Sequence, residues 1–168
     1  LGTETPPMAR IDEVAVDHLE TEKGFDGFRI VKSSHEASAS RSTIPPDIAV
    51  CKDCTQELSD LRNRRHGYFF ITCVNCGPRF TIIDRLPYDR ENTTMREFDM
   101  CPQCRREFKS PVDRRFHAQT IACPRCGPTL RLIDNEGSLI DADDSIAECG
   151  RLIEEGKIAL IKGNGGFH

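Results

Sequence analysis

The fold is decided by residues 51–76, CKDCTQELSDLRNRRHGYFFITCVNC, and residues 101–126, CPQCRREFKSPVDRRFHAQTIACPRC. Each stretch opens and closes with a C-x2-C pair. Two residues between cysteines form a tight knuckle that directs both sulfurs to one point. Zinc binds four thiolates as a tetrahedron at about 2.3 Å, so two knuckles complete one closed site. The spacing therefore predicts two four-thiolate zinc sites, with these ligands: Cys51, Cys54, Cys73, Cys76, Cys101, Cys104, Cys123 and Cys126.

Two pairings of the four knuckles are compatible with this rule. In the sequential pairing, the knuckles of residues 51–76 share one zinc and those of residues 101–126 share the other. In the interleaved pairing, the outer knuckles share one zinc and the inner knuckles share the second. A shift of 50 residues superposes the two stretches, including Glu57 on Glu107, Arg64-Arg65 on Arg114-Arg115 and Gly77-Pro78 on Gly127-Pro128. A regular repeat of this kind indicates a duplicated small unit and favours the sequential pairing.

The predicted sites are structural rather than catalytic. A catalytic zinc keeps one position open and usually has His or carboxylate among its ligands, whereas here four cysteines serve each metal. His66 and His117 lie in the middle of the two stretches, and we interpret both as surface or packing residues. Redox C-x2-C motifs are usually single and follow a strand, and nothing in the sequence indicates a secreted disulfide framework. We also expect the glycine after each last knuckle to take a positive φ, which turns backbone amides toward the sulfurs.

Composition excludes several classes of protein. The net charge is only −4, and the mildly basic middle of the sequence coincides with the cysteines, so no strong field favours nucleic acid. No stretch approaches the roughly 18 apolar residues that span a membrane, and no secretion signal is visible, which predicts a cytoplasmic protein without a membrane partner. The sequence begins at Leu1 and stops in a glycine-rich stretch, so we expect both ends to be cuts through a longer protein.

The flanking segments carry weaker signals. Residues 10–19 and 25–32 predict a β-hairpin, residues 33–46 predict a linker, and residues 130–141 predict a second hairpin. Residues 143–156 predict a helix that begins at an aspartate and ends at Gly156. Cys149 shares one helical face with Ile146 and Ile153, so we expect it to be a small buried hydrophobe rather than a ligand. Residues 157–161 predict a buried strand, and the glycines of residues 162–168 suit a turn or a phosphate site.

The cysteine pattern with its neighbouring residues resembles the HypF family, the carbamoyltransferases of [NiFe]-hydrogenase maturation. The resemblance extends to Pro46-Asp47-Ile48-Ala49, both Cys-Gly-Pro motifs, Tyr88-Asp89-Arg90, Asn92-Thr93-Thr94-Met95, Phe98 and residues 162–168. It implies an α+β fragment in which the duplicated zinc-finger region lies between pieces of two α/β-type domains. Residues 1–32 would end an acylphosphatase-like domain, 33–46 link it to the fingers at 47–95 and 96–135, and residues 136–168 would start a YrdC-like domain.

The resemblance also implies a function. Members of the family hydrolyse carbamoyl phosphate, make carbamoyl adenylate with ATP, and pass the carbamoyl group to the C-terminal cysteine of HypE for cyanide ligand synthesis. On this view the chain supplies the two structural zinc ions and contains no catalytic residue, so alone it is expected to be inactive. Nucleotide contacts are expected only from Lys162, Gly163, Gly165, Gly166 and His168.

Two alternatives remain open at this stage. One is a free-standing zinc module that binds a protein or nucleic acid, with double-stranded RNA as a ligand suggested by analogy with YrdC-like domains. It is disfavoured because nucleic-acid binders usually show a stronger basic surface with exposed aromatics. The other is a redox protein, which would keep its structure when zinc is removed, whereas closed four-thiolate sites contribute folding energy directly.

Overall fold

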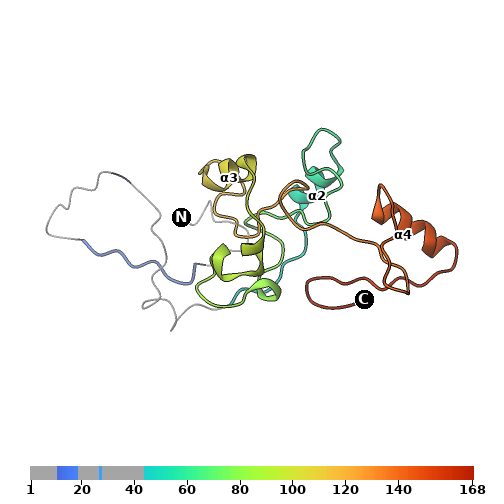
Figure 1. Ribbon diagram of the computed structural model, residues 1–168. Coiled ribbons are helices and arrows are strands. Elements are labelled where there is room, and N and C mark those ends of the chain that lie inside the picture. The colour runs from blue at the N-terminus through green and yellow to red at the C-terminus, as the bar shows by residue number, and fades with distance from the viewer. Residues whose placement is uncertain (1–10, 19–26, 28–43) are drawn as a thin grey trace.

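The computed structural model describes residues 11–18, 27 and 44–168 (Figure 1). The α-helices of these residues are α2 (Lys52–Ser59), α3 (Pro102–Lys109) and α4 (Ser145–Glu154). Three short 3-10 helices lie between α2 and α3, namely η1 (Phe80–Ile82), η2 (Arg90–Asn92) and η3 (Thr94–Glu97). In this part of the chain β-pairing is limited to isolated bridges, so the expected α+β class is not confirmed. The architecture is instead a loop-rich double finger, followed by α4 at the side of it.

The sequence repeat is also a structural repeat. Helices α2 and α3 begin directly after Cys51 and Cys101, and each runs for eight residues. The chain then turns back through a loop closed by one backbone bond, from the Gly67 amide to Leu58 or from the His117 amide to Phe108, both at 2.9 Å. Gly67 and His117 occupy equivalent positions and both have positive φ, 65° and 54°. The two fingers therefore share one backbone path, although only one of them uses glycine at this turn.

Much of the core consists of cysteine. One buried cluster joins Cys54, Cys73 and Cys76 to Ile71. Its counterpart joins Cys101, Cys104 and Cys123 to Ala118 and Ile121. Between the fingers lies a small apolar cluster made of Tyr68, Phe70, Ile82, Met95 and Ala122. Because this central cluster is small, apolar burial alone does not stabilise the fold. The fold therefore also requires that the two sulfur clusters be held together.

The segment between the fingers is held by Arg90. Its guanidinium donates to the carbonyls of Gln119 and Ile121 in the second finger, at 2.7 and 2.9 Å, and to the carbonyl of Phe98, at 2.7 Å. Burial lowers the pKa of Arg90, although nearby thiols act in the opposite direction. An arginine that satisfies three carbonyls fixes a segment whose regular secondary structure is limited to short 3-10 helices.

The prediction for the glycines after the last knuckles is only half right. Gly77 has φ of +101°, whereas Gly127 lies outside the left-handed region. A Cβ on Gly127 would lie 2.3 Å from the Tyr68 hydroxyl and 2.4 Å from the Ala122 Cβ, so close packing requires this glycine. The amides that reach sulfur are those of Asn75, to Cys73 at 3.3 Å, and Cys104, to Cys101 at 3.5 Å. The Gly77 amide bonds instead to the Ile48 carbonyl at 2.8 Å.

The flanking predictions have mixed outcomes. The strand expected over residues 10–19 is wrong for residues 11–18, which are exposed and irregular, and most of residues 25–32 and of the linker lies outside the described residues. The hairpin at residues 130–141 is confirmed as one bridge, Ile133 to Leu139, around Gly137 at φ of +88°. The predicted helix is confirmed as α4, with the Asp144 carboxylate accepting from the Ile146 and Ala147 amides.

Two predictions of burial after the hairpin are wrong. Ile146 and Ile153 of α4 are about half exposed, and Cys149 is only partly buried. Residues 157–161 form no strand, and Ile158 is 99% exposed. The apolar pattern of this region is real, but about half or more of the Ile146, Ile153 and Ile158 side chains stays exposed, and a strand also needs a neighbour to pair with. Among the described residues, no helix is long and apolar enough to cross a membrane.

Candidate metal centres

The first sulfur cluster gathers the two knuckles of the first finger. The Cys51 and Cys73 sulfurs lie 3.7 Å apart, Cys73 and Cys76 are also 3.7 Å apart, and Cys76 and Cys54 are 3.5 Å apart. Three of these cysteines are fully buried, and Cys51 is partly exposed. Helix α2 positions Cys54 one turn after Cys51, while a tight turn brings Cys76 back to Cys73.

The second cluster repeats this geometry in the second finger. The Cys101 and Cys123 sulfurs lie 3.8 Å apart, Cys123 and Cys126 are 3.7 Å apart, and Cys126 and Cys104 are 3.5 Å apart. Here Cys126 is the partly exposed member. The cysteines are thus grouped sequentially, and the interleaved pairing is wrong.

Both clusters have the dimensions of a zinc site. Four sulfurs at about 2.3 Å from a central zinc lie about 3.8 Å from one another, which is the edge of that tetrahedron. The observed separations of 3.5–3.8 Å match this edge. They exclude disulfides, in which sulfurs lie about 2.05 Å apart, and all nine cysteines are free. The two four-cysteine groups therefore suit two zinc ions.

Some of the sulfurs are already favoured as thiolates, the form that binds metal. Hydrogen bonding with the Cys54 and Cys73 sulfurs lowers the pKa of Cys76 to about 3. Burial acts to raise the pKa of Cys101, but the Cys104 amide and the neighbouring thiols lower it to about 6. The pKa of Cys54 is raised in turn by its hydrogen bonds to Cys73 and Cys76, so the protons that remain in the cluster leave when metal binds.

Arginine pairs from each finger reach the cluster of the other. Arg65 is 2% exposed and donates to the Ala122 carbonyl at 2.7 Å and to Glu107 at 2.5 Å. Its counterpart Arg115 is 4% exposed and donates to the Thr72 carbonyl at 2.9 Å and to Glu57. Burial opposes ionisation of Glu107, but the bonds from Arg65 and Arg64 outweigh it, and the pKa of this carboxyl is lowered. The repeat predicted that these residues are equivalent, but not that they bind across the fingers.

Arg79 is a further residue that motif reasoning missed. Its side chain is buried in the first finger and donates to the carbonyls of Cys73, Val74 and Cys76, at 3.0, 3.1 and 3.0 Å. These bonds fix the backbone of the knuckle that contains Cys73 and Cys76. The second finger has Thr129 at the corresponding position. This arginine is therefore not part of the repeat, and no motif signalled it.

The remaining candidate residues lie away from both clusters. His66 is exposed, and the His117 ring packs on Phe108 with centroids 4.9 Å apart, which confirms both as surface or packing residues. Residues 161–168 form a small hairpin in which the Gly163 amide donates to the Gly166 carbonyl at 2.7 Å. In that hairpin the Lys162 ammonium lies 5.5 Å from the centre of the Phe167 ring. The structure thus brings the expected nucleotide contacts Lys162, Gly163, Gly165, Gly166 and His168 into one turn.

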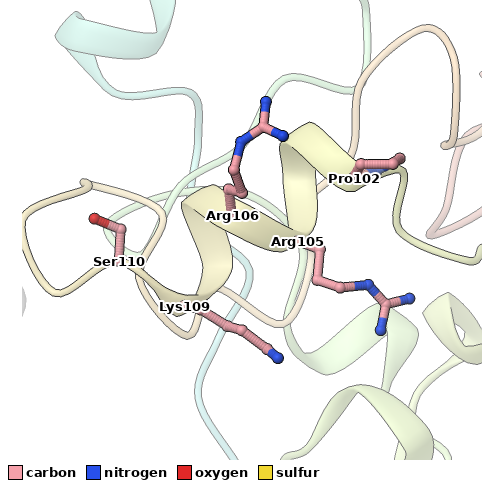
Figure 2. Close-up of a pocket in the computed structure, with 5 residues that line it drawn as sticks. All are labelled: Pro102, Arg105, Arg106, Lys109 and Ser110. Carbon is pink, nitrogen blue, oxygen red and sulfur yellow. The ribbon is translucent and has the colours of Figure 1, made fainter.

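Helix α3 also borders a shallow basic depression, lined by Pro102, Arg105, Arg106, Lys109 and Ser110 (Figure 2). The Arg106 side chain points to the opposite side of the helix from Arg105 and Lys109, so the three do not converge on one point. A ligand needs convergent polar groups in a concave pocket, so this surface does not form a built site.

Comparison with known proteins agrees with this geometry. The HypF finger family matches residues 50–83 and 100–133, one finger each. The chain therefore carries a pair of HypF-type zinc fingers. The whole chain is 51% identical over 168 residues to a protein of Methanocaldococcus jannaschii named probable carbamoyltransferase HypF, and it spans 22% of that relative's length. It is 45% identical over 168 residues to the carbamoyltransferase HypF of Rhodobacter capsulatus, again spanning 22% of the relative.

Solved structures give the same result. The crystal structure of T. kodakarensis HypF matches 77% of this chain with a TM-score of 0.72 and 54% identity, and the match covers 17% of that protein. A full-length HypF in a phosphate- and nucleotide-bound form matches 74% of the chain, with a TM-score of 0.67 and 48% identity, over 16% of its own length. The chain belongs to the HypF family and spans about a fifth of the length of the curated relatives that it matches.

Substitution of single cysteines distinguishes zinc ligands from cysteines that do not bind metal. Cys76→Ser removes one thiolate from a closed site, and we expect the zinc content to fall from two to one per chain or less. Cys149→Ser is the matched control, because Cys149 lies on α4 and belongs to neither cluster, so we expect two zinc ions to remain. Elemental analysis of the purified variants gives the count. One zinc in the Cys149 variant would make it a ligand, and two in the Cys76 variant would contradict the observed grouping.

Proposed function

We propose that this chain is the zinc-finger region of a HypF-type carbamoyltransferase, and that its eight clustered cysteines bind two structural zinc ions. The whole enzyme would use carbamoyl phosphate and ATP to carbamoylate the C-terminal cysteine of HypE in [NiFe]-hydrogenase maturation. The observation that carries the proposal is the pair of four-sulfur clusters inside two HypF fingers, in a chain similar along its whole length to HypF carbamoyltransferases.

The geometry supports a structural role for the metal. Every ligand position at each candidate site is taken by a cysteine, so no position stays open for substrate. Bound zinc would neutralise thiolate charge and fix the knuckles of a chain with a small apolar core. Arg65 and Arg115 would hold the two fingers against each other, and Arg79 would fix the second knuckle of the first finger. The catalytic chemistry would then belong to domains outside this region, and the finger pair would set their relative orientation.

The hairpin of residues 161–168 is proposed as the part of this chain that contributes to a nucleotide site. The Gly163 amide is used within the hairpin, but the backbone at Gly165 and Gly166 and the Lys162 ammonium suit an anion, because bare backbone can approach phosphate closely. The phosphate- and nucleotide-bound HypF structure is consistent with this role. We further propose a cytoplasmic location and domain limits at residues 32, 46, 95 and 135.

A chimaera tests the proposal. In the M. jannaschii relative, the 168 matching residues would be replaced by this chain. We expect the chimaera to carbamoylate HypE, as measured by the mass of the HypE C-terminal peptide with carbamoyl phosphate and ATP present. A Cys73→Ser/Cys76→Ser chimaera is the control that should fail. A zinc-loaded, folded chimaera without activity would contradict the proposed role.

The isolated chain provides the complementary test. It should contain two zinc ions and show no carbamoyl-phosphate-dependent ATP turnover, because no catalytic group is proposed within it. Clear turnover by the pure chain would contradict this division of roles. Zinc-dependent retardation of double-stranded RNA, in the absence of any effect on HypE, would favour the nucleic-acid-binding alternative.

A further inference from the structure

We propose that the two zinc sites load cooperatively, because each finger supplies the arginine that hydrogen-bonds a thiolate ligand of the other finger. This inference rests on the proposed zinc sites but goes beyond them. It assigns Arg64 and Arg114 as positioning residues for a metal site in the opposite finger.

The contact from the first finger to the second is made by Arg64. Its Nη2 lies 3.0 Å from the Cys104 sulfur and 3.0 Å from Glu107, which also accepts from Nε at 3.0 Å. Cys104 and Glu107 both belong to α3, so one guanidinium binds a ligand and the helix that carries it. A guanidinium stays protonated in proteins, so Arg64 brings a permanent positive charge to this contact.

The reciprocal contact is made by Arg114. Its Nη2 lies 2.7 Å from the Cys54 sulfur and 3.9 Å from the Cys51 sulfur. Its Nε lies 3.3 Å from the Glu57 carboxylate, and its Nη1 lies 3.3 Å from the Asp53 carboxylate, both of which belong to α2. Arg64 and Arg114 are equivalent in the repeat, as are their targets Cys104 and Cys54. Each finger thus donates an arginine hydrogen bond to a cysteine of the other finger, and the two contacts are equivalent in the repeat.

Each arginine is held in place by its own finger. Arg64 lies in the loop that joins Cys54 to Cys73, and this loop is closed by the bond from the Gly67 amide to Leu58. Arg114 lies in the corresponding loop between Cys104 and Cys123, closed at Phe108. Both ends of each loop are anchored at cysteines of one cluster. Loss of metal from a cluster releases these anchors and, with them, the arginine that serves the other cluster.

The charges at the two sites explain why the arginine contacts favour zinc binding. A zinc ion with four thiolates has two net negative charges, and partly buried charge needs compensation. Hydrogen bonds to charged groups are stronger than neutral ones, and removal of a group that orients a metal ligand typically lowers metal affinity about 10–100-fold. A filled first site therefore positions the donor that stabilises the second, and the converse holds by linkage. Half-loaded chains should be rare.

Site-resolved release of zinc tests the coupling. The zinc-loaded chain and its Arg64→Gln and Arg114→Gln variants would be challenged with a chelator, while a thiol-alkylating reagent labels the freed cysteines for mass spectrometry. Arg62→Gln is the matched control: Arg62 lies in the same loop as Arg64, and its side chain has no hydrogen bond or ion pair to any described residue. Glutamine keeps polarity and removes the charge.

The expected result is a crossed pattern. Arg64→Gln should expose the Cys101–Cys126 set first, and Arg114→Gln should expose the Cys51–Cys76 set first, each about 10-fold faster than in the parent chain. In the parent chain and in Arg62→Gln, both sets should become reactive together. Faster release confined to the finger that carries the substitution, equal release from both sites in the variants, or independent release in the parent would each overturn the coupling. A parent chain without zinc would instead contradict the proposed zinc sites themselves.

Discussion

Removal of zinc is expected to unfold residues 44–130. Among the described residues, two of the three buried clusters consist mainly of cysteine side chains, and the remaining apolar cluster has only five buried residues. Structural zinc sites contribute an apparent binding free energy of about 10–16 kcal/mol in small metallodomains. Net stabilities of domains are only about 5–15 kcal/mol, so loss of two ions exceeds what the rest of the fold supplies.

Hydrogen exchange in the presence of a chelator measures this effect. Amides of α2, α3 and the two loops should lose protection together, and added zinc should restore it. The same chelator saturated with zinc beforehand is the control and should leave protection unchanged. If protection of Cys54 and Cys104 survived complete removal of zinc, the apolar cluster alone would hold the fold, and the metal would not be structural.

Replacement of Arg65 by alanine is expected to cost about 1–3 kcal/mol of stability, the range for leaving a buried hydrogen-bonding group without its partner. The Arg65 guanidinium is 2% exposed, and its loss leaves the Ala122 carbonyl without this donor and Glu107 with Arg64 as its remaining cation. Arg115→Ala should have a similar effect on the symmetric contact with Glu57 and Thr72.

Urea unfolding of the zinc-loaded variants measures this loss. Arg62→Ala is the control, because it removes an exposed arginine from the same loop and should change the free energy of unfolding by less than about 0.5 kcal/mol. Arg65→Ala with a stability equal to that of the control would mean that the pairs across the fingers do not hold them together.

The sequence was sufficient to predict the sulfur clusters because their geometry is local. A C-x2-C knuckle directs its sulfurs by itself, and the 50-residue repeat indicated which knuckles belong together. The equivalence of Arg64-Arg65 with Arg114-Arg115, and of Glu57 with Glu107, was also visible. That these pairs bind across the fingers was not, since a repeat shows which residues correspond but not how two copies dock.

Other features depended on tertiary packing. Gly127 looked like a turn glycine, yet it is required by the approach of Tyr68 and Ala122 from distant parts of the chain. The apolar faces of α4 and residues 157–161 predicted burial, but burial requires a partner surface, and the isoleucines of both segments stay about half exposed or more. The function followed from family resemblance and was supported by the comparisons. Composition and spacing alone indicated only a protein with two structural metal sites.

X-ray absorption at the zinc edge, combined with elemental analysis of the purified chain, tests whether the protein holds two four-cysteine zinc sites. Two zinc ions per chain, each surrounded by four sulfur atoms at about 2.3 Å, are the predicted result. Coordination by nitrogen or oxygen at either metal would contradict closed four-cysteine sites. A protein without zinc whose cysteines are oxidised to disulfides would contradict the account as a whole.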